Sequence, residues 1–187
     1  WGYTEDIHSM NHKPSAHLGA ASVEQRLAEH VTQLSYAQLP ERTIERVATF
    51  VADTLSVGMA GSAVPEAQSL LRALLQTLAQ PPNHHNHHNQ HNHHNHHNQH
   101  NQIPVWGAGQ DLPAPEAIMA NAFNVHCQEF DCVHEGAVVH AMATLLPVLM
   151  AEAQARHDSH RPVSGKELTA AVVAGIDVAC TLGLAAN

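Results

Sequence analysis

The stretch AMATLLPVLMA, Ala141–Ala151, has no charged residue on any side. A helix that is apolar all round is typical of the centre of a domain, because an exposed face would place apolar surface in water. It belongs to a longer segment, 138–156, which we expect to be helical and to bend at Pro147. The stretch therefore predicts a domain built around one buried helix.

Other segments show the apolar spacing of helices. Two of them begin with a capping box, in which two side chains each bond the other's free backbone N–H: Ser22 with Gln25, and Ser164 with Glu167. Residues 103–109 are expected to be extended, and no sheet is predicted. The pattern thus predicts an all-α domain of about six helices, at 22–34, 39–61 (ended by Gly58 and Gly61), 64–80, 112–130, 138–156 and 163–187.

The two ends of the chain differ in character. Residues 1–21 are polar and aperiodic, so we expect a loose arm followed by one domain over 22–187. The last predicted helix reaches Asn187 without a stop signal, and the chain begins with Trp1 rather than Met. We therefore expect this chain to be a fragment of a longer protein.

A repeat interrupts the predicted domain at Asn83–Gln102. The unit NHHNHHNQH is written twice and followed by NQ, and it holds ten of the nineteen histidines. It contains no apolar residue to offset the entropy of ordering, so we expect disorder. A neutral surface loop is the simpler interpretation. A metal-binding tract is the alternative, because clustered imidazoles bind divalent ions.

Composition excludes several classes of function. The chain has 8 Lys+Arg against 17 Asp+Glu, so it lacks the basic surface that nucleic acids require. Three cysteines without CxxC spacing predict no disulfide framework and favour a reducing compartment. No uninterrupted apolar run has the roughly 18 residues of a membrane span, and the start lacks signal-peptide features. We expect a cytoplasmic protein that binds neither nucleic acid nor membrane.

The segment before the apolar stretch, QEFDCVHEGAVVH (128–140), is rich in titratable groups. Solvated charges at a helix entrance are one interpretation. A zinc site is a second, although the pattern C-x4-C-x-H-x5-H is not a common zinc spacing. An acid–base site is the third, with His140 at a helix N-terminus beside a carboxylate. The zinc hypothesis would use His126, Cys127, Cys132, His134 and His140.

Three blocks of the sequence resemble the MmgE/PrpD family. Residues 34–67 contain LSYAQLP and, after a helical pattern, DTLS where the family has D-T-L-G. Residues 129–151, EFDCVHEGAVVHAMATLLPVLMA, are similar without gaps to the family's D-F-D-D-T-H-x-G-s-l-v-H-P segment. Residues 164–185 resemble its s-G-k-e-l-l-x-A-l-v-a-G block. The likeness covers roughly 22–80 and 103–187.

The resemblance implies roles for particular residues. His140 matches the family's active-site histidine, and Asp131 matches the second acidic position. Glu129 stands where the family has the first aspartate. His134 and Val133 occupy the neighbouring positions that would contact substrate, although Val133 lacks the hydroxyl of the family's threonine. Cys132 replaces a third aspartate.

The resemblance also implies a function for the whole protein. It predicts a lyase or isomerase, similar to 2-methylcitrate dehydratase, that acts by acid–base chemistry next to a carboxylate of a small di- or tricarboxylate. Such enzymes are homodimers, use no metal or other cofactor, and pair the helical domain with an α/β lid. We expect this chain to stop before that lid and to be inactive alone. The alternatives are a decayed homologue and a metal-binding module that uses the histidine tract.

Deleting Asn83–Gln102 should leave the thermal unfolding temperature almost unchanged, with or without zinc, because a loop without apolar residues contributes little to a core. Thermal unfolding followed by circular dichroism measures this. Micromolar or tighter zinc binding that disappears with the deletion would instead identify the tract as a metal-capture module.

Overall fold

A computed structural model describes residues 21–80 and 102–186 of the chain. Nearly all of the predicted arm and of the histidine tract lies outside these residues. Six α-helices and one short 3-10 turn, η2, occupy most of the described part, so the predicted all-α domain of about six helices is confirmed. The helices are α1 Val23–Gln33, α2 Glu41–Gly61, α3 Pro65–Leu78, α4 Ala114–His126, α5 Ala141–Asp158 and α6 Gly165–Ala186, and η2 is Tyr36–Gln38.

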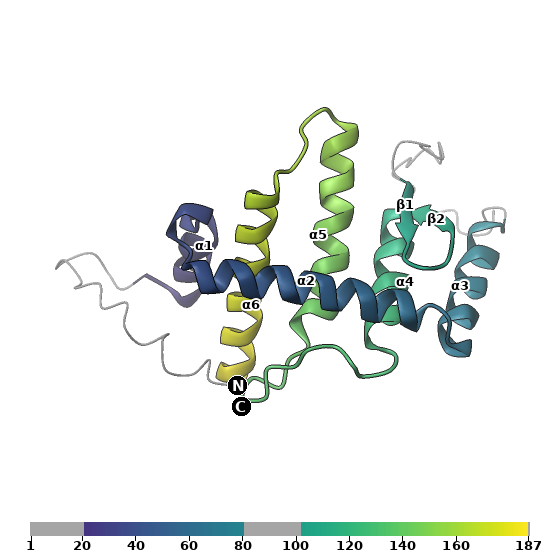
Figure 1. Ribbon diagram of the computed structural model, residues 1–187, viewed down its shortest axis with the longest axis horizontal. Coiled ribbons are helices and arrows are strands. Elements are labelled where there is room, and N and C mark those ends of the chain that lie inside the picture. Colours follow the sequence, from purple (N-terminus) through teal and green to yellow (C-terminus); the bar gives the residue numbers. More distant parts are fainter. Residues whose placement is uncertain (1–20, 81–101, 187) are drawn as a thin grey trace, which may run out of the picture.

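Three helices form a layer, and a fourth crosses it. Helices α4, α5 and α6 lie side by side, while α2 runs across all three (Figure 1). Helix α1 packs against α6 at one end of the layer, and α3 packs against α4 at the other. The chain bends by 80° between α2 and α3. The long crossing helix α2 therefore holds the three helices of the layer in register.

A small hairpin corrects the prediction that no sheet forms. Strands β1 (Gln102–Val105) and β2 (Gln110–Pro113) pair antiparallel, with Ile103 opposite Leu112. Gln102, assigned above to the disordered tract, is thus the first residue of β1. Strands of four residues are too short to show a clear alternating pattern. They are held by burial instead, because Ile103 and Leu112 are only 3% and 2% exposed.

A buried asparagine fixes this hairpin to helix α4. The Asn121 side-chain oxygen accepts a hydrogen bond from the backbone N–H of Trp106 at 2.8 Å. The side-chain NH2 of Asn121 donates to the backbone carbonyl of Pro104 at 3.0 Å. Asn121 is 1% exposed, so both bonds are shielded from water. A polar group can be buried at such a place because its hydrogen bonds are satisfied.

Helix α5 is less buried than its sequence predicts. Met142 and Leu146 pack with Val47 of α2 and Val172 of α6, while Ala151 joins a second cluster with the hairpin and α3. Val148, however, is 46% exposed. The prediction of a helix buried on every side is therefore wrong for the described chain: one side of α5 is buried and the other faces outward.

The sequence predicted both capping boxes correctly, but its prediction for Gly58 was wrong. Both capping boxes form, with reciprocal bonds of 2.9 and 3.3 Å at Ser22 and 2.8 and 3.3 Å at Ser164. Gly58 does not end α2, because the helix continues to Gly61. A Cβ at Gly58 would lie 3.0 Å from side-chain atoms of both Trp106 and Val125. Gly58 therefore serves close packing rather than helix termination.

Helix α6 qualifies the prediction about membrane spans. It has 22 residues and a mean hydropathy of 1.9 over its most apolar window, so by length and composition alone it is able to cross a membrane. Asp177 interrupts the apolar run and pairs with His30 of α1 at 2.9 Å. Val172 and Ala174 are buried against the rest of the chain, and much of the helix is partly exposed.

Gly61→Ala should destabilise the protein by about 2 kcal/mol and lower its Tm by roughly 4–8 °C, because a Cβ at this position would overlap the Asn124 carbonyl of α4. Gly165→Ala is the matched control, since nothing lies within 4 Å of its Cβ position. Calorimetry that found the two variants equally stable would contradict the close packing of α2 on α4.

Candidate active site

The site begins where helix α4 ends earlier than its sequence predicts. The helical pattern continues to Phe130, but α4 stops at His126. Glu129 adopts a left-handed conformation (φ 53°), and its N–H donates to the His126 carbonyl at 2.9 Å. This turn reverses the chain, so that Asp131 comes back beside His126.

The Asp131 carboxylate joins the end of α4 to the start of α5. One oxygen lies 3.1 Å from Nδ1 of His126, and the other lies 3.0 Å from Nδ1 of His140. The Asp131 side chain is 0% exposed, whereas those of His126 and His140 are 48% and 32% exposed. A buried carboxylate is stable only when it is paired and hydrogen-bonded, and here two imidazoles fill that role.

These contacts fix the tautomer of both histidines. A carboxylate accepts hydrogen bonds and donates none, so each imidazole must carry its proton on Nδ1 to make the bond. Nε2 of a neutral ring is then the free base. Asp131 therefore holds two imidazoles in the form in which Nε2 is able to take up a proton.

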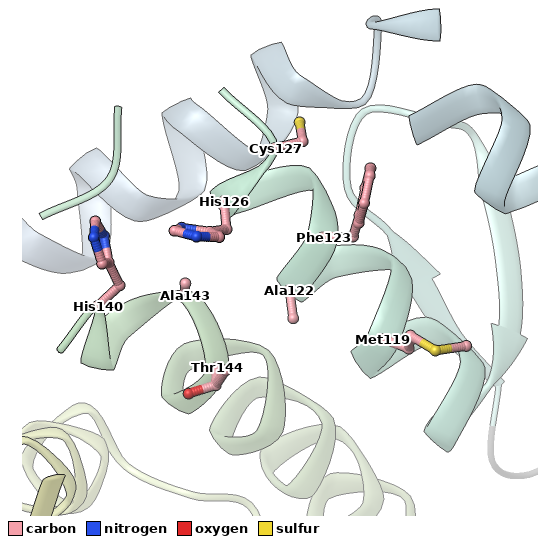
Figure 2. A pocket seen from close by; sticks show the side chains of 8 residues that line it. All are labelled: Met119, Ala122, Phe123, His126, Cys127, His140, Ala143 and Thr144. Carbon is pink, nitrogen blue, oxygen red and sulfur yellow. The ribbon is translucent and has the colours of Figure 1, made fainter. Parts of the chain in front are cut away.

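Both rings line a cleft of about 450 Å³ between α4 and α5. Figure 2 shows the two imidazoles close together at one end, with Met119 and Phe123 further along the cleft. The ring centroids of His126 and His140 are 4.7 Å apart, with the planes at 66°. The other lining residues, which are mostly apolar, are Ala122, Cys127, Ala143 and Thr144.

The N-terminus of α5 lies at the same end of the cleft as the two imidazoles. His140 is the N-cap residue of α5 and makes no side-chain cap hydrogen bond, and the first turn has no acidic side chain. The partial positive charge of this helix end favours an anion nearby. The predicted position of His140 at a helix N-terminus is thereby confirmed.

The other predicted site residues do not join this cluster. Glu129 is exposed on the turn that follows α4. Val133 is 48% exposed, and Nδ1 of His134 accepts a hydrogen bond from the Ala137 N–H at 3.0 Å. His134 also pairs with Val139 in a short backbone bridge. Neither Val133 nor His134 lines the cleft, so their predicted contact with substrate stays a prediction.

The cysteine-containing zinc site of the sequence analysis does not form. The Cys127 thiol points to the carbonyls of Asn124 and Gly61, at 3.5 and 3.9 Å. Cys132 packs into the cluster of α2, α5 and α6. Burial, and then the Asp53 and Asp131 carboxylates, raises the pKa of the Cys132 thiol. The thiolate that zinc binds is therefore less favourable here than at an exposed cysteine.

His126 is the residue that the acid–base hypothesis missed. The sequence offered it only as a zinc ligand, because a helix continuing to Phe130 would separate it from Asp131. The one available signal was that the apolar spacing of Ile118, Ala122 and Val125 is followed by a glutamate at position 129, and this signal is weak. The turn at Glu129 is what brings His126 to the carboxylate.

Comparisons with known proteins agree with the fold. The sequence profile of the MmgE/PrpD N-terminal domain matches residues 25–187. The chain is similar to the cis-aconitate decarboxylase-like protein oryM of Aspergillus oryzae (strain ATCC 42149 / RIB 40), with 24% identity over 166 residues. This match covers 88% of the chain and 30% of that relative. No solved structure matches the chain.

Asp131→Ala should lower the free energy of unfolding by about 2 kcal/mol, because it removes the hydrogen bonds of two imidazoles to a buried, charged acceptor. Asp177→Ala removes the partner of His30 at a similar distance, but both side chains there are about 40% exposed. That control should cost less than about 1 kcal/mol. Urea unfolding of both variants measures the difference, and equal losses would show that the buried Asp131 pairs add no more stability than the exposed pair.

Proposed function

This chain belongs to the MmgE/PrpD family, and from that premise we propose that it supplies the acid–base part of a lyase or isomerase active site. The proposed substrate is a small di- or tricarboxylate, as in 2-methylcitrate dehydratase-like members, and the proposed chemistry takes place on a carbon next to a carboxylate. Family membership and the cis-aconitate decarboxylase-like relative support lyase-type chemistry at the family level.

The placement of His140 carries this proposal. Its ring borders the cleft, its Nδ1 is held by the buried Asp131 carboxylate, and its backbone begins helix α5. A general base needs an orienting partner and access to substrate, and His140 has both. Asp131, rather than Glu129, is the carboxylate that orients it.

Proton abstraction next to a carboxylate fits this geometry. Nε2 of His140 takes the proton as the C–H bond breaks, and the imidazolium that forms is stabilised by the Asp131 carboxylate. The negative charge that develops on the substrate lies near the N-terminus of α5, whose partial positive charge favours it. In a dehydration, the electron pair left on carbon then expels the hydroxyl group, and the proton held by the His140 imidazolium passes to it, so that water leaves and the imidazole is neutral again.

In the part of the chain that the structure describes, the cleft lacks the cationic groups that would bind the carboxylates of the proposed substrate. The residues that line the cleft include no lysine or arginine to bind a substrate carboxylate. The chain spans 30% of the length of the curated relative that it matches. We propose that cationic residues elsewhere in the protein complete the site. By the family resemblance, the proposed enzyme is also a cytoplasmic homodimer that needs no cofactor for its chemistry.

His140→Ala should lower turnover by roughly 10²–10⁴-fold in the protein that carries this chain, the usual effect of losing a positioned proton-transfer group. Assays with citrate, 2-methylcitrate, cis-aconitate and iminodisuccinate identify the substrate on which to measure it. Asp131→Asn should also reduce kcat, because its amide is able to present an N–H to His140 and favour the wrong tautomer.

Two variants serve as controls for that experiment. Glu129→Gln should have a smaller effect, because Glu129 is exposed and outside the cluster. Cys132→Ser should change turnover very little, because the thiol packs away from the cleft. Full activity of His140→Ala on the substrate that is turned over would rule out the proposed mechanism.

A further inference from the structure

Three metal-ligating atoms converge at the end of the cleft. His126, Asp131 and His140 each offer one ligand atom, and these three atoms lie within 4.8 Å of one another. They come from the end of α4, the following loop and the N-cap of α5. We propose that these three residues form a binding site for one late first-row divalent metal ion, with Zn²⁺ as the leading candidate.

The spacing of the ligand atoms suits such an ion. Tetrahedral zinc with bonds of about 2.0–2.1 Å holds its ligand atoms about 3.3 Å apart. Oxygen Oδ2 of Asp131 lies 3.0 Å from Nδ1 of His140 and 3.4 Å from Nδ1 of His126. The two measured distances bracket the ideal one. For an ion to replace the two Nδ1 protons, the side chains must also rotate until the two nitrogens are about 3.3 Å apart.

The donor set selects the class of metal. Two imidazole nitrogens and one carboxylate oxygen suit Zn²⁺ and its neighbours, whereas Mg²⁺ and Ca²⁺ prefer oxygen ligands alone. The Asp131 charge is buried, so a cation placed against it is favoured more than one at an exposed carboxylate. Three protein ligands also leave a tetrahedral ion one position for a solvent or carboxylate oxygen.

A bound ion and the proposed proton transfer exclude each other. With the metal on Nδ1, the neutral His140 ring carries its proton on Nε2 and is no longer a base there. The site therefore acts as an inhibitory zinc site of the proposed enzyme. This consequence rests on the proposed function, whereas the metal site itself does not, so binding is tested without any measurement of turnover.

Co²⁺ titration of the full chain, followed by visible absorption, tests the site. Four-coordinate Co²⁺ absorbs strongly, whereas six-coordinate Co²⁺ on loosely arranged histidines absorbs weakly, so the signal separates this site from the histidine tract. We expect one strongly absorbing ion per chain, displaced by Zn²⁺. His126→Ala and Asp131→Asn should weaken this binding by at least roughly 10-fold, since even the loss of an outer-shell partner costs that much.

His157→Ala is the matched control, because it removes an exposed histidine of α5 outside the cluster. It should leave the spectrum unchanged. Weak absorption in the wild-type chain, or equal spectra for wild type and His126→Ala, would overturn the proposal. A near-ultraviolet thiolate-to-Co²⁺ band would overturn it as well, because it would place the ion on cysteine.

A second measurement on the wild-type chain covers the case in which the variants fail to fold. Diethylpyrocarbonate modifies accessible imidazoles, and mass spectrometry locates the modified residues. One equivalent of Zn²⁺ should protect His126 and His140 at least several-fold while His157 stays reactive. Equal reactivity of His126 and His140 with and without Zn²⁺ would contradict a metal site at this cluster.

Discussion

The buried carboxylate of Asp131 is the constraint on which the site depends. A buried charge needs hydrogen-bonding partners. The two partners of Asp131, His126 and His140, come from different helices. His126 closes α4 and His140 opens α5, so satisfying Asp131 fixes where one helix stops and the next begins. The left-handed turn at Glu129 is the local adjustment that makes this possible.

The helical layer supplies the rigid frame for that arrangement. Helix α2 crosses α4, α5 and α6, and its glycines allow a close approach: a side chain at Gly61 would overlap the backbone of α4 (Figure 1). Asn121 ties the hairpin to α4, and Trp106 in the hairpin turn lies against Gly58 of α2. Because α2 contacts both α4 and α5 and the hairpin adds contacts to α4, the cleft between the two helices is held in shape.

His126, Asp131 and His140 support two proposed uses, acid–base chemistry and metal binding. The two differ in whether a proton or a metal ion occupies Nδ1 of each histidine. With protons there, Asp131 orients two bases toward the cleft. With a divalent ion there, the histidines become ligands and lose that basicity. Metal binding at such a site releases protons and depends on pH, because the imidazoles must give up their Nδ1 hydrogens. Of the residues in the zinc hypothesis based on cysteine spacing, only His126 and His140 belong to the cluster.

Local sequence determined the elements that depend on local forces. Apolar spacing and capping boxes predicted the six helices, and the apolar run after His140 placed that residue at a helix start. Tertiary structure decided the rest. The hairpin, the packing role of Gly58 and the early end of α4 all depend on contacts between distant residues or on the burial of Asp131. His126 joins His140 for that reason: hydrogen bonding to one buried charge outweighs the weak local preference for another turn of helix.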